Sequence, residues 1–169
     1  MSTKEPRRFL SWNPTLSLIR SIRDYQSMNS KIDQAHSAGR VLCRVGMKSA
    51  VLRHIFWSTV CGCDIPINSK IGSGFNLKHS QGVVIHPDCM IGKDCTIMSQ
   101  VVIGTSGKGG VPAIGDNVMV GSGAKILGPI VIGSGVTVGA NAVVLCDVAD
   151  NETVVGICLL YTSPSPRDA

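Results

Sequence analysis

The stretch IGDNVMVGSGAKILGPIVIGSGVTVGANAVV, residues 114–144, repeats every six residues. A branched aliphatic residue marks each repeat, and these residues are Ile114, Val120, Ile126, Ile132, Val138 and Val144. The residue that follows is often Gly, and the position four after the aliphatic is small or apolar. A period of six matches neither the 3.6 of a helix nor the 2.0 of a continuous strand. It indicates a short strand followed by a turn, repeated along the chain.

The same six-residue period extends toward the N-terminus, with two breaks in phase. Its earlier aliphatic positions are Ile65, Ile71, Leu77, Ile85, Ile91, Ile97 and Ile103. Two extra residues lie between Leu77 and Ile85, and five lie between Ile103 and Ile114. Three six-residue units make one triangular coil, so residues eighteen apart stack and line one core. The pattern predicts an all-β solenoid, a parallel β-helix, whose two insertions lie at corners where function tends to gather.

Composition limits the kinds of partner. The chain has 169 residues, 44% of them hydrophobic, and its 4% of aromatics suits a narrow solenoid core. Its net charge of +5 is uneven, because residues 1–62 carry ten Lys/Arg against three acids, whereas residues 63–169 carry six against eight. Aromatic residues are few and are not interleaved with the basic ones, so we expect no nucleic-acid binding.

Seven cysteines occur without an apparent signal peptide, because the N-terminus MSTKEPRRF is charged and no suitable apolar run follows. A reduced, cytoplasmic setting is the simplest interpretation. Cys61 and Cys63 form a lone C-x-C, and Cys89 and Cys95 lie six apart. We interpret all four as small core residues rather than metal ligands.

The first part of the chain predicts two helices. Asn13-Pro14 is typical of a helix start, and apolar spacing carries this helix to about Met28. A second helix is expected from Val41 to about Thr59. Its basic stripe of Arg40, Arg44 and Lys48 is interpreted as a solvated face; contact of residues 40–55 with a membrane surface is the less favoured alternative.

Three segments follow from these patterns. Residues 1–62 form an N-terminal helical segment, and residues 63–156 form the β-helix. The ladder is expected to stop after Val148, with residues 149–156 as its exit. The end of the chain, CLLYTSPSPRDA, does not continue the repeat, so residues 157–169 are predicted to be a disordered tail of non-native sequence.

Histidine is the side chain best suited to act as a base at neutral pH, and the chain has four. His36 and His54 fall in the helical segment. His86 takes a position where Gly is usual and is interpreted as a corner residue. His79 alone lies beside the first break in phase, which makes it the candidate general base.

The segment DIPINSKIGSGFNLKHSQGVVI, residues 64–85, resembles serine acetyltransferases, which belong to the hexapeptide-repeat acyltransferases. The resemblance implies a left-handed parallel β-helix and an acetyl-CoA-dependent O-acetyltransferase that converts L-serine to O-acetyl-L-serine in cysteine biosynthesis. It also implies a catalytic dyad with His79 as general base and Asp64 as the carboxylate that orients it. Acetyl-CoA would be a co-substrate, and no metal is implied.

The resemblance continues through the glycine-rich stretch GTSGKGG, residues 104–110, and the coils after it. In that family these parts flank a coenzyme A channel between subunits, so the expected oligomer is a homotrimer, with a dimer of trimers as the further option. The residues expected to contact the coenzyme are Gly104, Gly107, Lys108, Gly109, Gly121 and Lys125.

Three departures from the family pattern keep other functions open. Lys78 stands where the family has an aspartate before the histidine, its Asp-Arg-His segment after the glycine-rich loop is missing, and its Gly-x-Pro-Ala exit is replaced after Gly156. A sugar O-acetyltransferase of capsule or exopolysaccharide synthesis is therefore the alternative. Two more distant ones are a non-catalytic assembly module and a metal protein of the γ-carbonic-anhydrase type, although only His79 and His86 lie in the coils.

Overall fold

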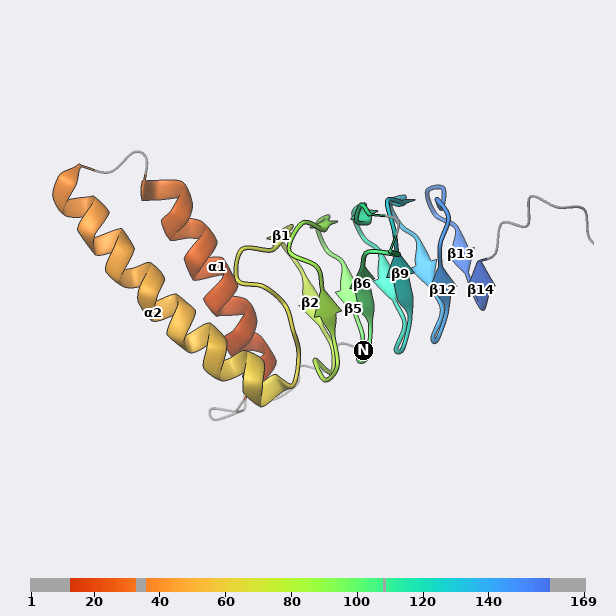
Figure 1. Cartoon of the computed structure of the whole chain (residues 1–169), viewed down its shortest axis with the longest axis horizontal. Coiled ribbons are helices and arrows are strands. Elements are labelled where there is room, and N and C mark those ends of the chain that lie inside the picture. Colours follow the sequence, from red (N-terminus) through yellow and green to blue (C-terminus); the bar gives the residue numbers. More distant parts are fainter. Residues whose placement is uncertain (1–12, 33–35, 108, 159–169) are drawn as a thin grey trace, which may run out of the picture.

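The computed structural model describes residues 13–32, 36–107 and 109–158. Two helices pack side by side at one end of a rod of stacked coils (Figure 1). Helix α1 spans Pro14–Ile32 and helix α2 spans Ser37–Cys61. The described part of the chain then forms fourteen short strands, all in the rod.

The strands build three sheets, one on each face of a triangular prism, and every strand pairing is parallel. The first face holds β1 (Lys70–Ile71), β4 (Met90–Ile91), β7 (Ala113–Ile114) and β10 (Val131–Ile132). The second holds β2 (Asn76–Leu77), β5 (Thr96–Ile97), β8 (Met119–Val120), β11 (Thr137–Val138) and β13 (Thr153–Val154). The third holds β3 (Val84–Ile85), β6 (Val102–Gly104), β9 (Lys125–Leu127), β12 (Val143–Val144) and β14 (Ile157–Cys158). The predicted solenoid with a helical N-terminal segment is confirmed.

The aliphatic residues of the six-residue pattern fill the prism. In a typical strand the first residue faces outward and the second is buried. Ile97, Ile103, Val120, Ile126 and Ile132 are fully buried in one continuous core. Branched side chains suit this narrow interior because each coil stacks the same kind of residue directly on the coil before it.

Both insertions bulge outward at corners and leave the strands in register. Ala113 pairs with Val131 eighteen residues later, whereas Met90 pairs with Ala113 across twenty-three, because the glycine-rich loop lies between them. Lys70 pairs with Met90 across twenty residues, which includes the first insertion. The insertions therefore add surface without disturbing the core.

The expectation that the ladder stops after Val148 is wrong. Val148 itself bridges to Ile132, and β13 and β14 add to the second and third faces. Thr153 pairs with Thr137 across only sixteen residues, and Ile157 pairs with Val143 across fourteen. The last corners are shorter, so a fixed six-residue period no longer predicts the positions of the strands there. Strand β14 also begins inside the predicted tail; residues 159–169 of that tail lie outside the described residues.

Both helices are longer than expected. Helix α1 begins at Pro14 as predicted, where the Asn13 Oδ1 accepts a hydrogen bond from the Leu16 N–H at 3.1 Å. It continues past Met28, however, and α2 starts before Val41 and ends after Thr59. The end of α2 is set by Gly62, whose left-handed φ of 61° and N–H bonds to the Ser58 and Thr59 carbonyls cap the helix. The Met28 side chain packs where a Cβ at Gly46 would lie, so the two helices approach closely there.

Helix α1 closes the open end of the solenoid. The Arg23 Nη1 donates to the Ile71 carbonyl at 2.6 Å, and its Nη2 donates to the Gly72 carbonyl. The Gln26 Nε2 donates to the Ser69 carbonyl at 2.8 Å. These side chains satisfy backbone acceptors that would otherwise form a free sheet edge.

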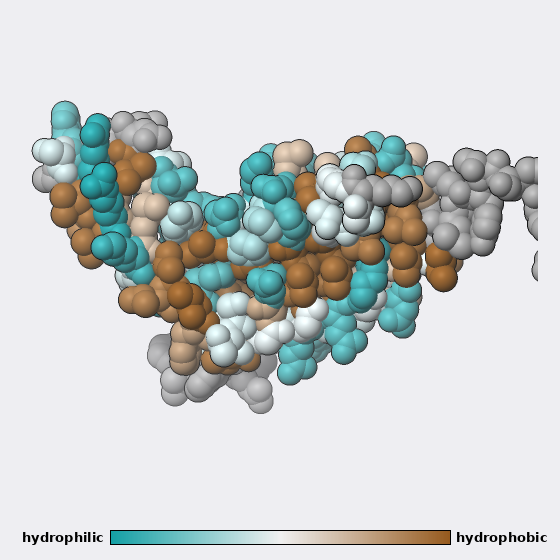
Figure 2. All heavy atoms as spheres, viewed as in Figure 1, coloured by the Kyte–Doolittle hydropathy of each residue, from teal (hydrophilic) through white to brown (hydrophobic). Residues whose placement is uncertain are grey.

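The apolar side of α2 faces outward. Six apolar residues of this helix are each 55% exposed or more: Val41, Leu42, Val45, Leu52, Ile55 and Phe56. Smaller or polar residues such as Ala50, His54 and Cys61 are buried instead. Figure 2 shows hydrophobic and hydrophilic residues side by side over this helix, and a hydrophobic band along the visible face of the solenoid. No described helix is long and apolar enough to cross a membrane.

Candidate active site

His79 lies in the first insertion, at the corner that joins the second face to the third. We call this corner, made by residues 78–83, 98–101, 121–124 and 139–142, the His79 corner. In later coils the turn uses one left-handed residue, such as Gln100 or Asn141, and His79 is an additional left-handed residue with φ of 58°. A non-glycine residue in this conformation costs about 1–2 kcal/mol. Such strain is common at functional positions, and the imidazole is exposed.

Asp64 lies where the solenoid begins, on the third face next to the His79 corner. Its N–H donates to the Val83 carbonyl at 2.8 Å, and its carbonyl accepts from the Ile85 N–H at 2.9 Å. This pairing places Asp64 beside β3, directly after the segment that carries His79. Among the described contacts, none joins the Asp64 carboxylate to the His79 imidazole. The fold thus places Asp64 on the third face, next to the end of the segment that carries His79, and the catalytic roles of both residues stay a prediction.

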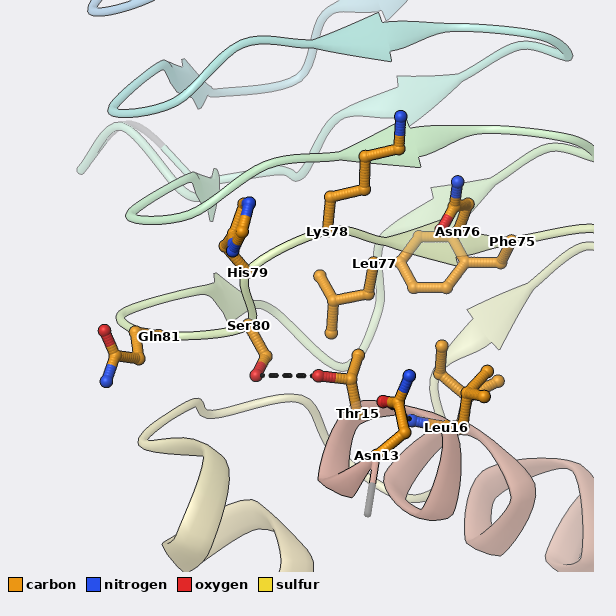
Figure 3. A pocket seen from close by; sticks show the side chains of 11 residues that line it. Asn13, Thr15, Leu16, Phe75, Asn76, Leu77, Lys78, His79, Ser80 and Gln81 are labelled. Carbon is orange, nitrogen blue, oxygen red and sulfur yellow. Dashed lines mark hydrogen bonds between the residues drawn. The ribbon is translucent and has the colours of Figure 1, made fainter. Parts of the chain in front are cut away.

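A cavity of about 650 Å³ opens beside His79. Residues 75–81 form one wall and the start of α1 forms the other, with Asn13, Thr15, Leu16 and Ile19. The two walls are joined by a hydrogen bond of 3.2 Å between the Thr15 and Ser80 hydroxyls (Figure 3). The volume suits a small molecule. Sequence reasoning found His79 but missed the α1 wall, because no local signal places Asn13-Pro14 against residues 75–81.

The glycine-rich loop forms a second open region. Gly104 ends β6, and Gly107 and Gly109 both have φ of 78°. A Cβ at Gly107 or Gly109 would meet nothing within 4 Å, so their backbone is accessible to a ligand. Lys108 lies outside the described residues. A cavity of about 580 Å³ adjoins the loop, and its lining residues are Thr105, Ser106, Leu127, Gly128, Pro129, Ile130 and Leu145. The lining combines the two hydroxyl residues Thr105 and Ser106 with the aliphatic residues Leu127, Ile130 and Leu145.

Lys125 and Gly121 have structural partners at the His79 corner. The Lys125 Nζ donates to the Gln100 carbonyl at 2.8 Å and to the Gly123 carbonyl at 2.9 Å. At Gly121 a Cβ would lie 2.6 Å from the Ala140 nitrogen, so this glycine is required by the stacking of coils. Neither position needs a coenzyme to explain it.

The two open regions lie at different corners of one chain. The His79 corner joins the second face to the third, whereas the glycine-rich loop joins the third face to the first. A single protomer therefore does not bring His79 and the loop together.

The other histidines have structural environments. The His86 Nδ1 lies 3.3 Å from the Asp88 N–H and 3.7 Å from its carboxylate, in a corner as predicted. His54 is buried in the helical segment, with its Nδ1 3.3 Å from the Ser21 hydroxyl. Burial lowers the pKa of His54, although a hydrogen bond to the Ile65 backbone and the Asp64 charge oppose this. No cluster of three or more His, Cys, Asp or Glu suited to a metal occurs among the described residues.

The cysteines singled out in the sequence are free thiols in or beside the core. Cys61, Cys89 and Cys95 are buried, and Cys63 is half-buried. Burial raises the pKa of Cys63 and of Cys89 to about 11, so both are protonated and unreactive at neutral pH. Cys146 is disulfide-bonded, which the expectation of a fully reduced chain did not foresee.

Comparison with known proteins agrees with this geometry. The family described as Bacterial transferase hexapeptide (six repeats) matches residues 112–146. A serine acetyltransferase of Staphylococcus aureus (strain Mu50 / ATCC 700699) is 46% identical over 99 residues, which cover 57% of this chain and 46% of that protein. The soybean serine acetyltransferase apoenzyme structure aligns with a TM-score of 0.59 and 33% identity, over 85% of this chain and 67% of that one.

The chain belongs to the serine acetyltransferase family of hexapeptide-repeat proteins. Another structure of this family, Neisseria gonorrhoeae serine acetyltransferase in complex with serine, aligns with a TM-score of 0.66 and 31% identity, over 87% of this chain and 56% of that one. The chain spans about half the length of the curated serine acetyltransferases that it matches. Membership in the family thus rests mainly on the solenoid and the helices next to it.

Proposed function

We propose that this chain is an acetyl-CoA-dependent O-acetyltransferase of the serine acetyltransferase type, with L-serine as the first candidate acceptor. The observation that carries the proposal is the position of His79, a strained left-handed residue on the wall of a cavity of about 650 Å³. The family and the N. gonorrhoeae complex with serine support both the reaction type and this acceptor.

In the proposed reaction His79 removes the proton of the acceptor hydroxyl. The oxygen then attacks the thioester carbon of acetyl-CoA, and the C–S bond breaks as the tetrahedral intermediate collapses. The imidazolium returns its proton to the departing coenzyme A thiolate, so no covalent enzyme intermediate forms. Asp64 stabilises the imidazolium from the adjacent third face, and backbone N–H groups hold the oxyanion.

A homotrimer is part of the proposal, because the loop region of one protomer could then meet the His79 corner of its neighbour. Cyclic symmetry suits a prism-shaped protomer whose corners carry complementary parts of a site. Pairing of trimers through the helical segment and a cytoplasmic location belong to the same proposal.

Thiol release from acetyl-CoA in the presence of L-serine tests it. The variant His79→Ala is expected to lower turnover by roughly 10²–10⁴-fold, the usual contribution of a general base. The matched control is His36→Ala, since His36 is exposed, precedes α2, and caps the helix through its backbone carbonyl with no capping hydrogen bond from its side chain. Full activity of His79→Ala would refute the assignment, and an equal loss in the control would point to a folding defect.

A sugar O-acetyltransferase is the second candidate. One observation favours it: the described residues that line the cavity include no carboxylate, although the ammonium of serine would require one. Acetylation of a panel of sugars in the same assay, with no response to L-serine, would select this alternative.

A further inference from the structure

The glycine-rich loop shares its corner of the prism with a histidine and an aspartate. We call this corner, made by residues 86–89, 104–107, 109–112, 128–130 and 145–147, the loop corner. The His86 N–H donates to the Ile103 carbonyl at 2.9 Å, and a Cβ at Gly104 would lie 3.8 Å from the His86 Cβ. His86 therefore lies one coil before the start of the loop, in the position where Gly is usual.

The backbone of Asp88 determines which nitrogen of His86 carries the proton. The Asp88 N–H donates to the His86 Nδ1 at 3.3 Å, so the proton of the neutral imidazole is on Nε2. The Asp88 carboxylate lies 3.7 Å from the same Nδ1, and its side chain is 73% exposed. Asp147, the other described carboxylate at this corner, instead accepts the Val131 N–H at 2.8 Å. His86 and Asp88 thus combine an N–H donor and a carboxylate in one turn at the surface.

This pair of groups is complementary to a zwitterionic amino acid. An imidazole N–H donates to a ligand carboxylate, and an aspartate carboxylate accepts from a ligand ammonium. The described lining of the cavity beside His79 includes no carboxylate, although the ammonium of serine requires one. The loop corner of a neighbouring chain contains that group.

The third face indicates how a neighbouring chain approaches, because this face lies between the His79 corner and the loop corner. Four of its five outward strand positions are branched aliphatic, namely Val84, Val102, Val143 and Ile157. The fifth is Lys125, whose ammonium is already bound to two carbonyls. The second face has three threonines and an asparagine in the same positions. Burial of three third faces around a three-fold axis brings the loop corner of each chain against the His79 corner of the next.

We propose that His86 and Asp88 of one subunit bind the acceptor that reacts at His79 of the neighbouring subunit. The His86 Nε2–H donates to the carboxylate of L-serine, and the Asp88 carboxylate pairs with its ammonium. The inference rests on the proposed O-acetyl transfer and its trimer, and it identifies the residues that specify the acceptor.

Matched acceptors separate the two contacts. The compound 3-hydroxypropanoate lacks the ammonium of serine, and L-serinamide lacks the carboxylate. Asp88→Asn should raise KM for L-serine by about 10-fold to 100-fold with little change in kcat, and change KM for 3-hydroxypropanoate by less than about twofold. His86→Gly, which introduces the residue usual at this position, should raise KM for L-serine and for 3-hydroxypropanoate but not for L-serinamide.

The control for these variants is Asp24→Asn. It removes a carboxylate that pairs with Arg53 in the helical segment, and surface ion pairs of this kind contribute little to stability. An unchanged KM for L-serine in both Asp88→Asn and His86→Gly would overturn the inference and leave the proposed O-acetyl transfer intact. The inference would also be overturned by equal losses for all three acceptors, because these would indicate a structural role.

Mixed trimers test whether the two halves of the site come from different subunits. His79→Ala and the double variant His86→Gly/Asp88→Asn are co-expressed with different affinity tags, and trimers that carry both tags are isolated. In each mixed trimer one site joins an intact His79 to an intact His86 and Asp88. We therefore expect about one third of the wild-type turnover at low L-serine concentration. No recovery above the two parent variants would refute the shared site.

A binding measurement separates the two proposals if no acceptor is acetylated. Calorimetric titration with L-serine reports on the His86 and Asp88 contacts without turnover. Binding that weakens about tenfold in Asp88→Asn but not in Asp24→Asn would support these contacts and refute the proposed reaction. Undetectable binding of L-serine, together with no turnover, would refute both.

Discussion

Replacement of Lys125 by Met distinguishes a structural lysine from a coenzyme ligand. The family resemblance implies that Lys125 meets a coenzyme phosphate, but its ammonium donates to the carbonyls of Gln100 and Gly123 at 2.8 and 2.9 Å. Those carbonyls belong to the turns of two consecutive coils. The bonds therefore tie the coils together at the His79 corner, and Met retains the stem of the side chain while it removes both.

The expected loss of stability is moderate. Hydrogen bonds to charged groups contribute about 1.5–3 kcal/mol each. Lys125 is half-buried, so water replaces part of what is lost, and release of its ordered side chain returns up to about 2 kcal/mol. We therefore expect Lys125→Met to lower the free energy of unfolding by about 1–2 kcal/mol. For a chain of this size that corresponds to a melting temperature lower by about 2–8 °C.

Two measurements on one sample test this reasoning: thermal unfolding at fixed protein concentration, and KM for acetyl-CoA. The structural role predicts a lower melting temperature with KM changed by less than about twofold. Lys70→Met is the control, since Lys70 is also an outward-facing strand residue but lies exposed on the first face. An unchanged melting temperature with a tenfold higher KM would refute the structural role and restore Lys125 as a phosphate ligand.

Three further outcomes are expected. Arg23→Met should lower the free energy of unfolding, measured in urea, by about 1–3 kcal/mol, because the carbonyls of Ile71 and Gly72 lose a charged donor. A loss below about 0.5 kcal/mol would contradict the capping role. Burial lowers the pKa of His54 below its ordinary 6.5, so the unfolded chain binds this proton first as pH falls. The free energy of unfolding, measured by urea titration, should therefore decrease as the pH is lowered from about 6.5. The decrease should be less steep in His54→Gln than in the wild type. His79→Gly should melt at a higher temperature than His79→Ala by the equivalent of about 1 kcal/mol, since φ of 58° suits glycine; equal melting temperatures would argue against strain at this corner.

The period of six predicted most of the solenoid because each coil repeats the same arrangement of short strands, turns and buried aliphatic residues. A buried aliphatic residue every sixth position specifies the strands, the core and the parallel stacking together, as Ile97, Val120 and Ile126 illustrate. The end of the ladder was missed because its corners are shorter, and corner length depends on backbone turns rather than on the aliphatic pattern. The C-terminal end of α2 was missed although Gly62, the residue that caps it in the left-handed conformation, directly follows Cys61 in the sequence.

The candidate site was only partly predictable for a similar reason. His79 could be found because an insertion interrupts a regular pattern at that point. The opposite wall of its cavity comes from α1, and no short-range signal relates Thr15 to Ser80, sixty-five residues later. The acceptors of Lys125 likewise lie in two separate turns, and only the register of the coils brings them within reach.

The contacts of α1 with the first coil also determine where the length of this rod can change. Arg23 and Gln26 bind carbonyls of residues 69–72 alone, so the cap recognises one particular coil and is indifferent to how many follow it. One more coil of eighteen residues, inserted between β9 and β10, would lengthen the rod by about 4.8 Å and leave the cap unchanged. A coil added ahead of β1 would instead require a new cap. Evolution and protein engineering can therefore change the length of this molecule anywhere beyond the capped coil, with the helical end as its fixed origin.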